Sequence, residues 1–343
     1  MAEGEGRVFL RGLSSETYGL GEFRRRQRAA DRVRRAGTVV DDASVGHSGD
    51  SDQSRTSWML GPGDDPFLTQ TLQVHFVELL PGGANHGHGH QNEACFYILE
   101  GSGYEIHDGV RYEWEQDDFA IVHTDCVHKH FNANKDVRAL ALVLKAKTNW
   151  MAMGLWQQGR SGPFDKPGYG PRQDWSQLWT PGAAAKRKVV KKSDTRWEDT
   201  RDGRVRIISS AEKTDVRTNS VDVYQQEIAP GGSSAKHWHM ADEAVYVIAG
   251  SGYSLQWDVE AEIDDRYYAR IAKEPTRWEF SAGDLLYVPQ NTVHQQFNSG
   301  REPLVVLSAQ NRLFKLLGYD NVTYLEDAPE RGGIDRATVT AGG

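Results

Sequence analysis

Two halves of the chain repeat each other, and this internal repeat constrains the fold more than any other feature of the sequence. Three short motifs occur twice, each time 149 residues apart, as His88 and His237 are. A fixed spacing between copies indicates that one structural unit has been duplicated. The repeated motifs are Pro81-Gly-Gly and Pro230-Gly-Gly, His88-Gly-His90 and His237-Trp-His239, and Gly101-Ser-Gly-Tyr and Gly250-Ser-Gly-Tyr.

A fourth pair of segments shows where the copies differ in length. The sequence DDFAIVHTDCVHKHFN, residues 117–132, resembles GDLLYVPQNTVHQQFN, residues 283–298, at a spacing of 166. The second copy therefore has 17 extra residues, which we place at 258–274. Insertions of this kind usually lie at the surface, so we expect a loop or a lid there.

The pattern within each copy predicts an all-β fold. Short segments of alternating apolar residues, separated by turns rich in glycine, are typical of strands. A chain of 343 residues is long enough for two such domains. We expect an N-terminal extension over 1–65 with a short helix, a first barrel over 66–160, a linker over 161–195, a second barrel over 196–325 and a tail over 326–343.

Charge and composition exclude several classes of protein. The net charge of −8 argues against a nucleic-acid-binding body. The sequence contains no run of 18 apolar residues that would predict a membrane span. We also find no secretory signal, so we expect a cytoplasmic protein. The two cysteines exclude a disulfide scaffold and fit a reducing compartment. Residues 22–37 carry seven arginines and predict a solvated helix, or one that packs on a neighbouring subunit, in preference to an anion or membrane site.

Histidines at a spacing of two predict a metal site in each copy. Side chains two apart on a strand point to the same face, so both histidines of each His-x-His pair can point into a barrel. In the second copy Glu243 keeps this parity, and His294 from a distant strand completes the set. Such imidazole and carboxylate ligands suit Fe, Mn, Co, Ni, Cu or Zn. The candidate ligands are His88, His90 and His128 in the first copy, and His237, His239, Glu243 and His294 in the second.

The first copy departs from this pattern at the carboxylate. Ala94 stands opposite Glu243 in the alignment, and Glu93 lies one position early, on the wrong parity for a regular strand. A site of three histidines is the simplest interpretation. An alternative uses His86 and His88 as the pair, with Glu93 as the carboxylate ligand.

These motifs resemble those of the cupin superfamily. The second copy has the first cupin motif in full, and its second motif follows in Gly283-Asp, Pro289, His294 and Asn298. The resemblance covers about 70–145 and 215–310. It implies a bicupin, that is, two double-stranded β-helix barrels of jelly-roll type.

Within the bicupins, the first copy looks like the branch of gentisate and salicylate 1,2-dioxygenases. The similar segments are HGHQNEACFYILEG, residues 88–101, and DDFAIVHTDCVHKHFN. That branch keeps three histidines in its first cupin and lacks the glutamate. The resemblance implies an Fe(II)-dependent dioxygenase that opens a hydroxylated aromatic ring with O₂ in aromatic catabolism. His123 and His130 are the candidate acid–base or orienting residues beside the metal.

Other functions stay open from the sequence alone. The complete second site resembles those of flavonol dioxygenases and oxalate-degrading bicupins, and a metal-stabilised binding protein without turnover is a third possibility. Besides Fe(II), the sites suit Mn, Ni, Cu or Zn, especially the second. We expect a small aromatic substrate, O₂, no nucleic acid or membrane partner, and a homo-oligomer, either a dimer or a tetramer. Four arginines are candidates for holding a substrate carboxylate: Arg111, Arg138, Arg206 and Arg217.

Overall fold

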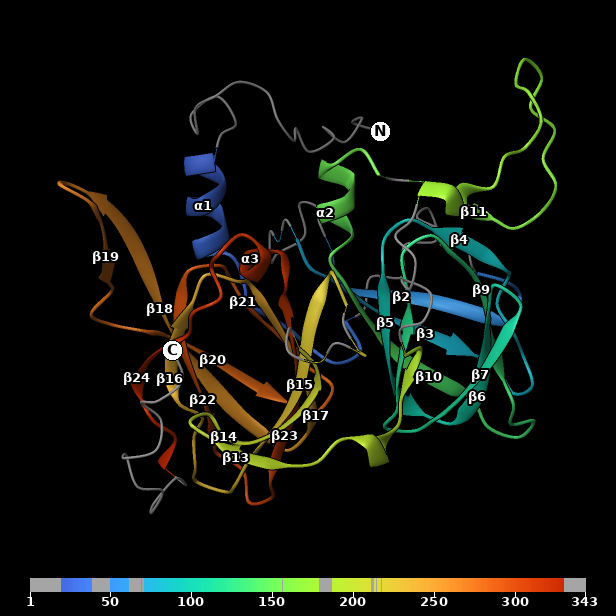
Figure 1. Cartoon of the computed structure of the whole chain (residues 1–343). Coiled ribbons are helices and arrows are strands. Elements are labelled where there is room, and N and C mark those ends of the chain that lie inside the picture. Colours follow the sequence, from blue (N-terminus) through green and yellow to red (C-terminus); the bar gives the residue numbers. More distant parts are fainter. Residues whose placement is uncertain are drawn as a thin grey trace.

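The alternating segments of each copy form antiparallel strands, and these strands build two barrels that lie side by side (Figure 1). The computed structural model describes residues 20–38, 50–61, 69, 71–155, 157–178, 187–210, 213, 215–216 and 218–329. Each barrel consists of a larger sheet and a smaller sheet, as expected for the predicted all-β bicupin.

Barrel one contains the first copy of the repeat. Its larger sheet has the order β12-β8-β5-β10-β3-β2, and its smaller sheet has the order β11-β4-β9-β6-β7. The strands are β2 (Ser54–Leu60), β3 (Gln73–Leu79), β4 (His88–His90), β5 (Ala94–Glu100), β6 (Ser102–His107), β7 (Val110–Glu115), β8 (Phe119–Val122), β9 (Cys126–Asn132), β10 (Ala139–Lys145), β11 (Gln158–Arg160) and β12 (Val189–Val190).

Barrel two contains the second copy. Its larger sheet has the order β1-β21-β17-β23-β15-β14-β13, and its smaller sheet has the order β19-β18-β22-β16-β24, with β20 paired to β18. The strands are β1 (Val33–Arg34), β13 (Glu198–Thr200), β14 (Gly203–Ser209), β15 (Val221–Ile228), β16 (Lys236–His239), β17 (Glu243–Ala249), β18 (Ser251–Ile263), β19 (Tyr267–Ile271), β20 (Thr276–Ser281), β21 (Leu285–Val288), β22 (Thr292–Asn298), β23 (Leu304–Asn311) and β24 (Thr323–Glu326).

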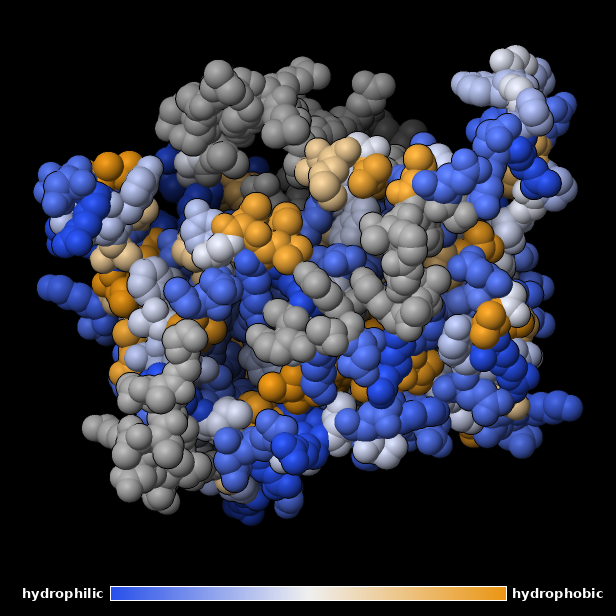
Figure 2. Space-filling view, viewed as in Figure 1, coloured by the Kyte–Doolittle hydropathy of each residue, from blue (hydrophilic) through white to orange (hydrophobic). Residues whose placement is uncertain are grey.

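Among the described residues the helices are few and short, and they lie outside the barrels. They are α1 (Leu20–Ala29), α2 (Lys147–Ala152), α3 (Leu313–Leu316) and the 3₁₀ turns Trp175–Leu178 and Lys192–Asp194. In the part of the chain that the structure describes, none is long and apolar enough to cross a membrane. The face shown in Figure 2 is mostly hydrophilic, with hydrophobic residues in small separate patches.

Strand parity divides the apolar side chains between a core that both barrels share and the interiors of the barrels. Leu142 and Leu144 of β10 lie in a core that both barrels share, together with Leu307 and Ala309 of β23. The alternate residues of the same strands face the barrel interiors, where Val143 packs in barrel one. The two larger sheets therefore pack against each other, and every second residue of their strands points into a barrel.

A glycine separates the two strands in each Gly-Ser-Gly-Tyr motif. Gly101 and Gly250 have φ of +85° and +87°, a conformation that side chains other than glycine rarely adopt. A Cβ atom at Gly101 would also lie 2.7 Å from the carbonyl oxygen of Arg138. The chain therefore turns at these glycines from the larger sheet into the smaller one.

The structure corrects several expectations about the connecting segments. The arginine-rich helix ends at Ala29, before β1 begins. It packs on barrel two of its own chain, where Arg24 and Arg28 bond the carbonyl oxygens of Gln290 and Val259. Strand β1 joins barrel two by pairing with β21, and β12, from the expected linker, joins barrel one by pairing with β8. Strand β2, which we placed in the N-terminal extension, pairs with β3 in barrel one.

The 17 extra residues of the second copy form regular structure. They continue β18 and pair it with β19 from Val259 and Ile271 to Ile263 and Tyr267. Figure 1 shows this hairpin projecting away from barrel two. The expected loop or lid is thus an extended hairpin, because backbone pairing of the two strands satisfies their hydrogen bonds.

Candidate metal centres

Site one consists of His88, His90 and His128, and the structure brings these three predicted residues together inside barrel one. His88 pairs directly with His128 across β4 and β9. The ring centroids are 5.6 Å apart for His88 and His90, 4.2 Å for His88 and His128, and 4.8 Å for His90 and His128. All three side chains are buried, and their ligand atoms lie within 4.8 Å of one another.

Site two places three histidines in nearly the same arrangement. His237 pairs with His294 across β16 and β22. The centroids are 5.4 Å apart for His237 and His239, 4.2 Å for His237 and His294, and 4.9 Å for His239 and His294. Glu243 from β17 joins this cluster and is also buried.

Backbone carbonyls orient every ring in the two clusters. In all six histidines Nδ1 lies 2.6–3.3 Å from a carbonyl oxygen two residues away. This contact fixes the proton on Nδ1 and leaves Nε2 as the ligand atom. His128 Nε2 is buried and has no hydrogen-bond partner among the described residues. A buried acceptor without a partner is costly, and a metal ion bound there would satisfy it.

Burial also keeps the imidazoles in the form that binds metals. It lowers the pKa of His88 to about 4 and holds the pKa of His90, His128 and His237 well below the ordinary value. At neutral pH these rings are therefore uncharged, as a ligand must be. The donor sets fit the divalent transition metals that the sequence indicates.

A dedicated set of donors holds Glu243 in site two. Oε1 accepts hydrogen bonds from the hydroxyls of Tyr224, at 3.0 Å, and Ser308. Oε2 lies 3.2 Å from His239 Nε2 and 3.4 Å from Gln310 Nε2. These donors orient the Glu243 carboxylate towards the Nε2 atoms of His239 and His294, which face the same space.

In barrel one, Glu93 does not reach the metal cluster. It faces barrel two, where its carboxylate accepts hydrogen bonds from the backbone N–H groups of Asn219 and Ser220. His86 is exposed, and its carbonyl oxygen accepts from His88 Nδ1. The alternative set of His86, His88 and Glu93 is therefore wrong, because the parity of β5 directs Glu93 outward.

A cavity adjoins site one where Glu243 stands in site two. The space between its walls, counted together with the solvent at its open side, is about 340 Å³. His88 and His90 lie in its wall, as does Lys145 from the end of β10. No sequence motif singles out Lys145, although its parity with Val143 on β10 could have indicated that it points inward. The remaining lining residues are Asp50, Thr56, His75, Val77, Asn85, Ala94, Phe96, His130 and Val143.

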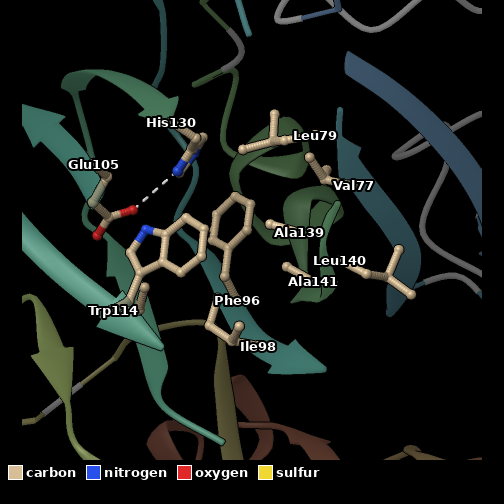
Figure 3. A pocket seen from close by; sticks show the side chains of 11 residues that line it. Val77, Leu79, Phe96, Ile98, Glu105, Trp114, His130, Ala139, Leu140 and Ala141 are labelled. Carbon is tan, nitrogen blue, oxygen red and sulfur yellow. Dashed lines mark ion pairs between the residues drawn. The ribbon is translucent and has the colours of Figure 1, made fainter. Parts of the chain in front are cut away.

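His130 lies in the wall of this cavity and also in the wall of a second, mainly apolar one. Figure 3 shows the Glu105 carboxylate directed at His130, beside the rings of Trp114 and Phe96. Glu105 is fully buried between His107 Nε2, at 3.0 Å, and His130 Nδ1, at 3.1 Å. Burial opposes ionisation, but the two histidines lower the pKa of Glu105 to about 2. No motif singles out Glu105 either. The difference between the copies, with Ser254 at the equivalent position of the second, could have indicated it.

The remaining predicted residues lie elsewhere. His123 is buried at the end of β8 and lines neither cavity. Arg111 pairs with Glu113 and Arg138 pairs with Glu78 and Glu100, while Arg206 stacks on Trp197. None of these three arginines lines either cavity, and Arg217 lies outside the described residues.

Comparisons with known proteins agree with this architecture. A family model described as cupin matches residues 195–312, and one described as cupin domain matches residues 75–144. The chain belongs to the cupin superfamily. It is a bicupin with two histidine-rich candidate metal sites.

Solved structures show the same fold at low identity. A variant of oxalate decarboxylase from Bacillus subtilis aligns with a TM-score of 0.56 and 15% identity, over 86% of this chain and 80% of that one. A second structure of that enzyme, which concerns its Mn(II) centres, aligns over the same shares with a TM-score of 0.56 and 14% identity. Identity this low supports the fold alone. A search of the curated proteins gave no significant match.

Proposed function

We propose that this bicupin is a metal-dependent dioxygenase that opens the ring of a hydroxylated aromatic compound with O₂, and that site one is the catalytic site. The cavity beside His88 and His90 is the observation that carries the proposal. This cavity provides space beside site one, whereas Glu243 fills the corresponding space in site two. The likeness of residues 88–101 to gentisate and salicylate dioxygenases points to the same chemistry.

His88, His90 and His128 would hold the metal. Fe(II), when bound, supplies redox chemistry and coordination positions for substrate oxygens and O₂. The aromatic and aliphatic walls of the two cavities exclude water from a planar ring. The side chains that provide these walls include Phe96, Val77 and Val143.

His130 is suited to take the proton of a substrate hydroxyl. Its Nδ1 faces Glu105, so its Nε2 is the atom available as a base, and Nε2 has no hydrogen-bond partner among the described residues. The Oδ1 of Asn85 accepts from the backbone N–H of His130 at 2.7 Å and fixes this part of β9. We propose an acid–base role for His130. We propose one for His123 as well, which would act from outside the cavity lining.

Oxygen uptake by single-site variants tests the assignment. After anaerobic reconstitution with Fe(II), the chain is screened against gentisate, salicylate, hydroxynaphthoate, catechol and hydroquinone. We expect His128→Ala to lower oxygen uptake by several orders of magnitude, because it removes a ligand of site one. The matched variant His294→Ala, at the same position of barrel two, should lose one metal per chain and keep most of the turnover.

The complete ligand set of site two supports a second candidate function. Three histidines and Glu243 resemble the sites of flavonol dioxygenases and oxalate-degrading bicupins, so site two could carry the reaction. If His294→Ala abolishes turnover while His128→Ala remains active, the catalytic assignment is reversed. If neither metal-loaded site consumes any substrate of the screen or oxalate, the protein binds metal without this chemistry.

A further inference from the structure

Lys145 is a buried cation for which the described part of the chain provides no counter-ion. Its side chain is 3% exposed, at the end of β10 in the wall of the cavity beside site one. Among the described residues no carboxylate pairs with its Nζ, which lies 5.9 Å from the centre of the Trp58 ring. The one acidic residue of the cavity, Asp50, accepts a hydrogen bond from Thr56 at 2.7 Å. A buried charge is costly unless something pairs with it.

The two barrels carry side chains of opposite charge at neighbouring equivalent positions. In barrel two Glu243 pairs with Gln310 between β17 and β23. In barrel one Cys95 pairs with Leu144, so Ala94 and Lys145 occupy those two positions. Site two therefore has a built-in carboxylate beside a neutral amide, and site one has a methyl group beside an ammonium group.

The donors around Glu243 change in the same way. Tyr224 and Ser308, which face each other and donate to Glu243, correspond to His75 and Val143, which face each other in barrel one. All four positions point into their barrels and lie beside the metal cluster. The space that a carboxylate fills in site two is part of a cavity in site one.

We propose that site one binds a ligand that carries a carboxylate, and that Lys145 pairs with this carboxylate in the space that Glu243 fills in site two. The ligand thus supplies in site one the carboxylate that Glu243 supplies in site two. This inference rests on the proposed function in taking site one as the substrate site. It assigns to Lys145 the part that none of the three described arginines can take. Lys145 is then a positioning and specificity residue.

Calorimetric binding of two ligands that differ only in the carboxylate tests the proposal. The probes are 2,5-dihydroxybenzoate and hydroquinone, added without oxygen to the metal-loaded full chain. We expect Lys145→Met to bind 2,5-dihydroxybenzoate about 10- to 100-fold more weakly, because a charge-assisted hydrogen bond is lost. Its affinity for hydroquinone should stay within about two-fold of the wild type. The control Lys147→Gln, which removes a cation outside the cavity lining, should bind both ligands nearly as the wild type does.

A second variant transfers the pattern of site two into site one. Ala94→Glu combined with Lys145→Gln should retain about two metals per chain and lose detectable binding of 2,5-dihydroxybenzoate. Wild-type affinity in Lys145→Met or in this double variant overturns the proposal, as does a wild type that binds neither ligand. A chain that shows these binding differences and consumes no oxygen contradicts the proposed function alone.

Discussion

At the scale of one residue, the burial of the Lys145 ammonium group lowers the stability of the protein. Burial lowers its pKa to about 7. Since this lies below the ordinary 10.5, the folded protein binds fewer protons than the unfolded chain between about pH 7 and 10.5. Stability therefore rises with pH across this window, and the cost of burying the charge is fully present below pH 7.

Replacing this lysine by an uncharged side chain of similar length should make the pH dependence visible. We expect Lys145→Met to be more stable than the wild type at pH 6, by at most about 5 kcal/mol. The difference should shrink towards pH 10, where the unfolded lysine also loses its proton. Chemical denaturation of both proteins from pH 6 to 10, in the same metal-loaded state, measures it. A constant difference across this range would contradict the burial of an unpaired ammonium group.

At the scale of elements, the segment from α1 to β1 acts as a strap on barrel two. Arg24 donates to the carbonyl oxygen of Gln290 at 3.0 Å, and Arg35 bonds Asp284 at 2.9 Å. Val33 packs against the interior core of the barrel. Seven arginines in one short segment are therefore used largely inside the chain, on the acidic and carbonyl groups of barrel two.

Arg32 is the most deeply buried arginine described in this segment. It is 2% exposed and bonds Gln256 at 2.6 Å and Asp258 at 3.0 Å. We expect Arg32→Ala to lower the free energy of unfolding by about 2 kcal/mol, because the buried Gln256 and the partly exposed Asp258 lose a charged donor. The exposed Arg25, which pairs with Glu22, provides the control, and Arg25→Ala should change stability by less than about 0.5 kcal/mol. Equal effects in the two variants would show that the strap contributes little.

At the scale of the whole molecule, the two barrels form one structure with a common core. The shared core joins the larger sheets, and polar contacts surround it. Tyr97 accepts from Gln225 at 2.6 Å, and Asn149 donates to Asn311 at 3.1 Å. The predicted dimer or tetramer stays a prediction, which light scattering would test.

Glu93 provides a test of this arrangement that also separates it from metal binding. Its carboxylate accepts two backbone N–H bonds from barrel two, so we expect Glu93→Ala to lower the free energy of unfolding by about 2–3 kcal/mol. Elemental analysis after iron-replete expression should still approach two metals per chain. Loss of one metal in this variant, with normal stability, would return Glu93 to the ligands of site one.

The sequence alone determined the repeat, the all-β class and the spacing of the candidate ligands. These properties depend on local rules: side chains alternate along a strand, and glycine permits the turn at positions 101 and 250. The same parity correctly separated Ala94 from Glu93. For this reason the histidines that the structure brings together in each barrel are those that the motifs singled out.

Only the tertiary structure decided what surrounds those ligands. That Glu93 bonds Asn219 depends on how the two larger sheets pack, since the two residues are far apart in the sequence. The same holds for Lys145, which reaches the cavity because β10 lies beside β5. It also holds for β1, which joins barrel two, and for β12, which joins barrel one, because backbone pairing at a sheet edge is nearly independent of sequence. Local patterns therefore identify ligands, whereas the charge and shape of the space beside them arise from contacts between distant segments.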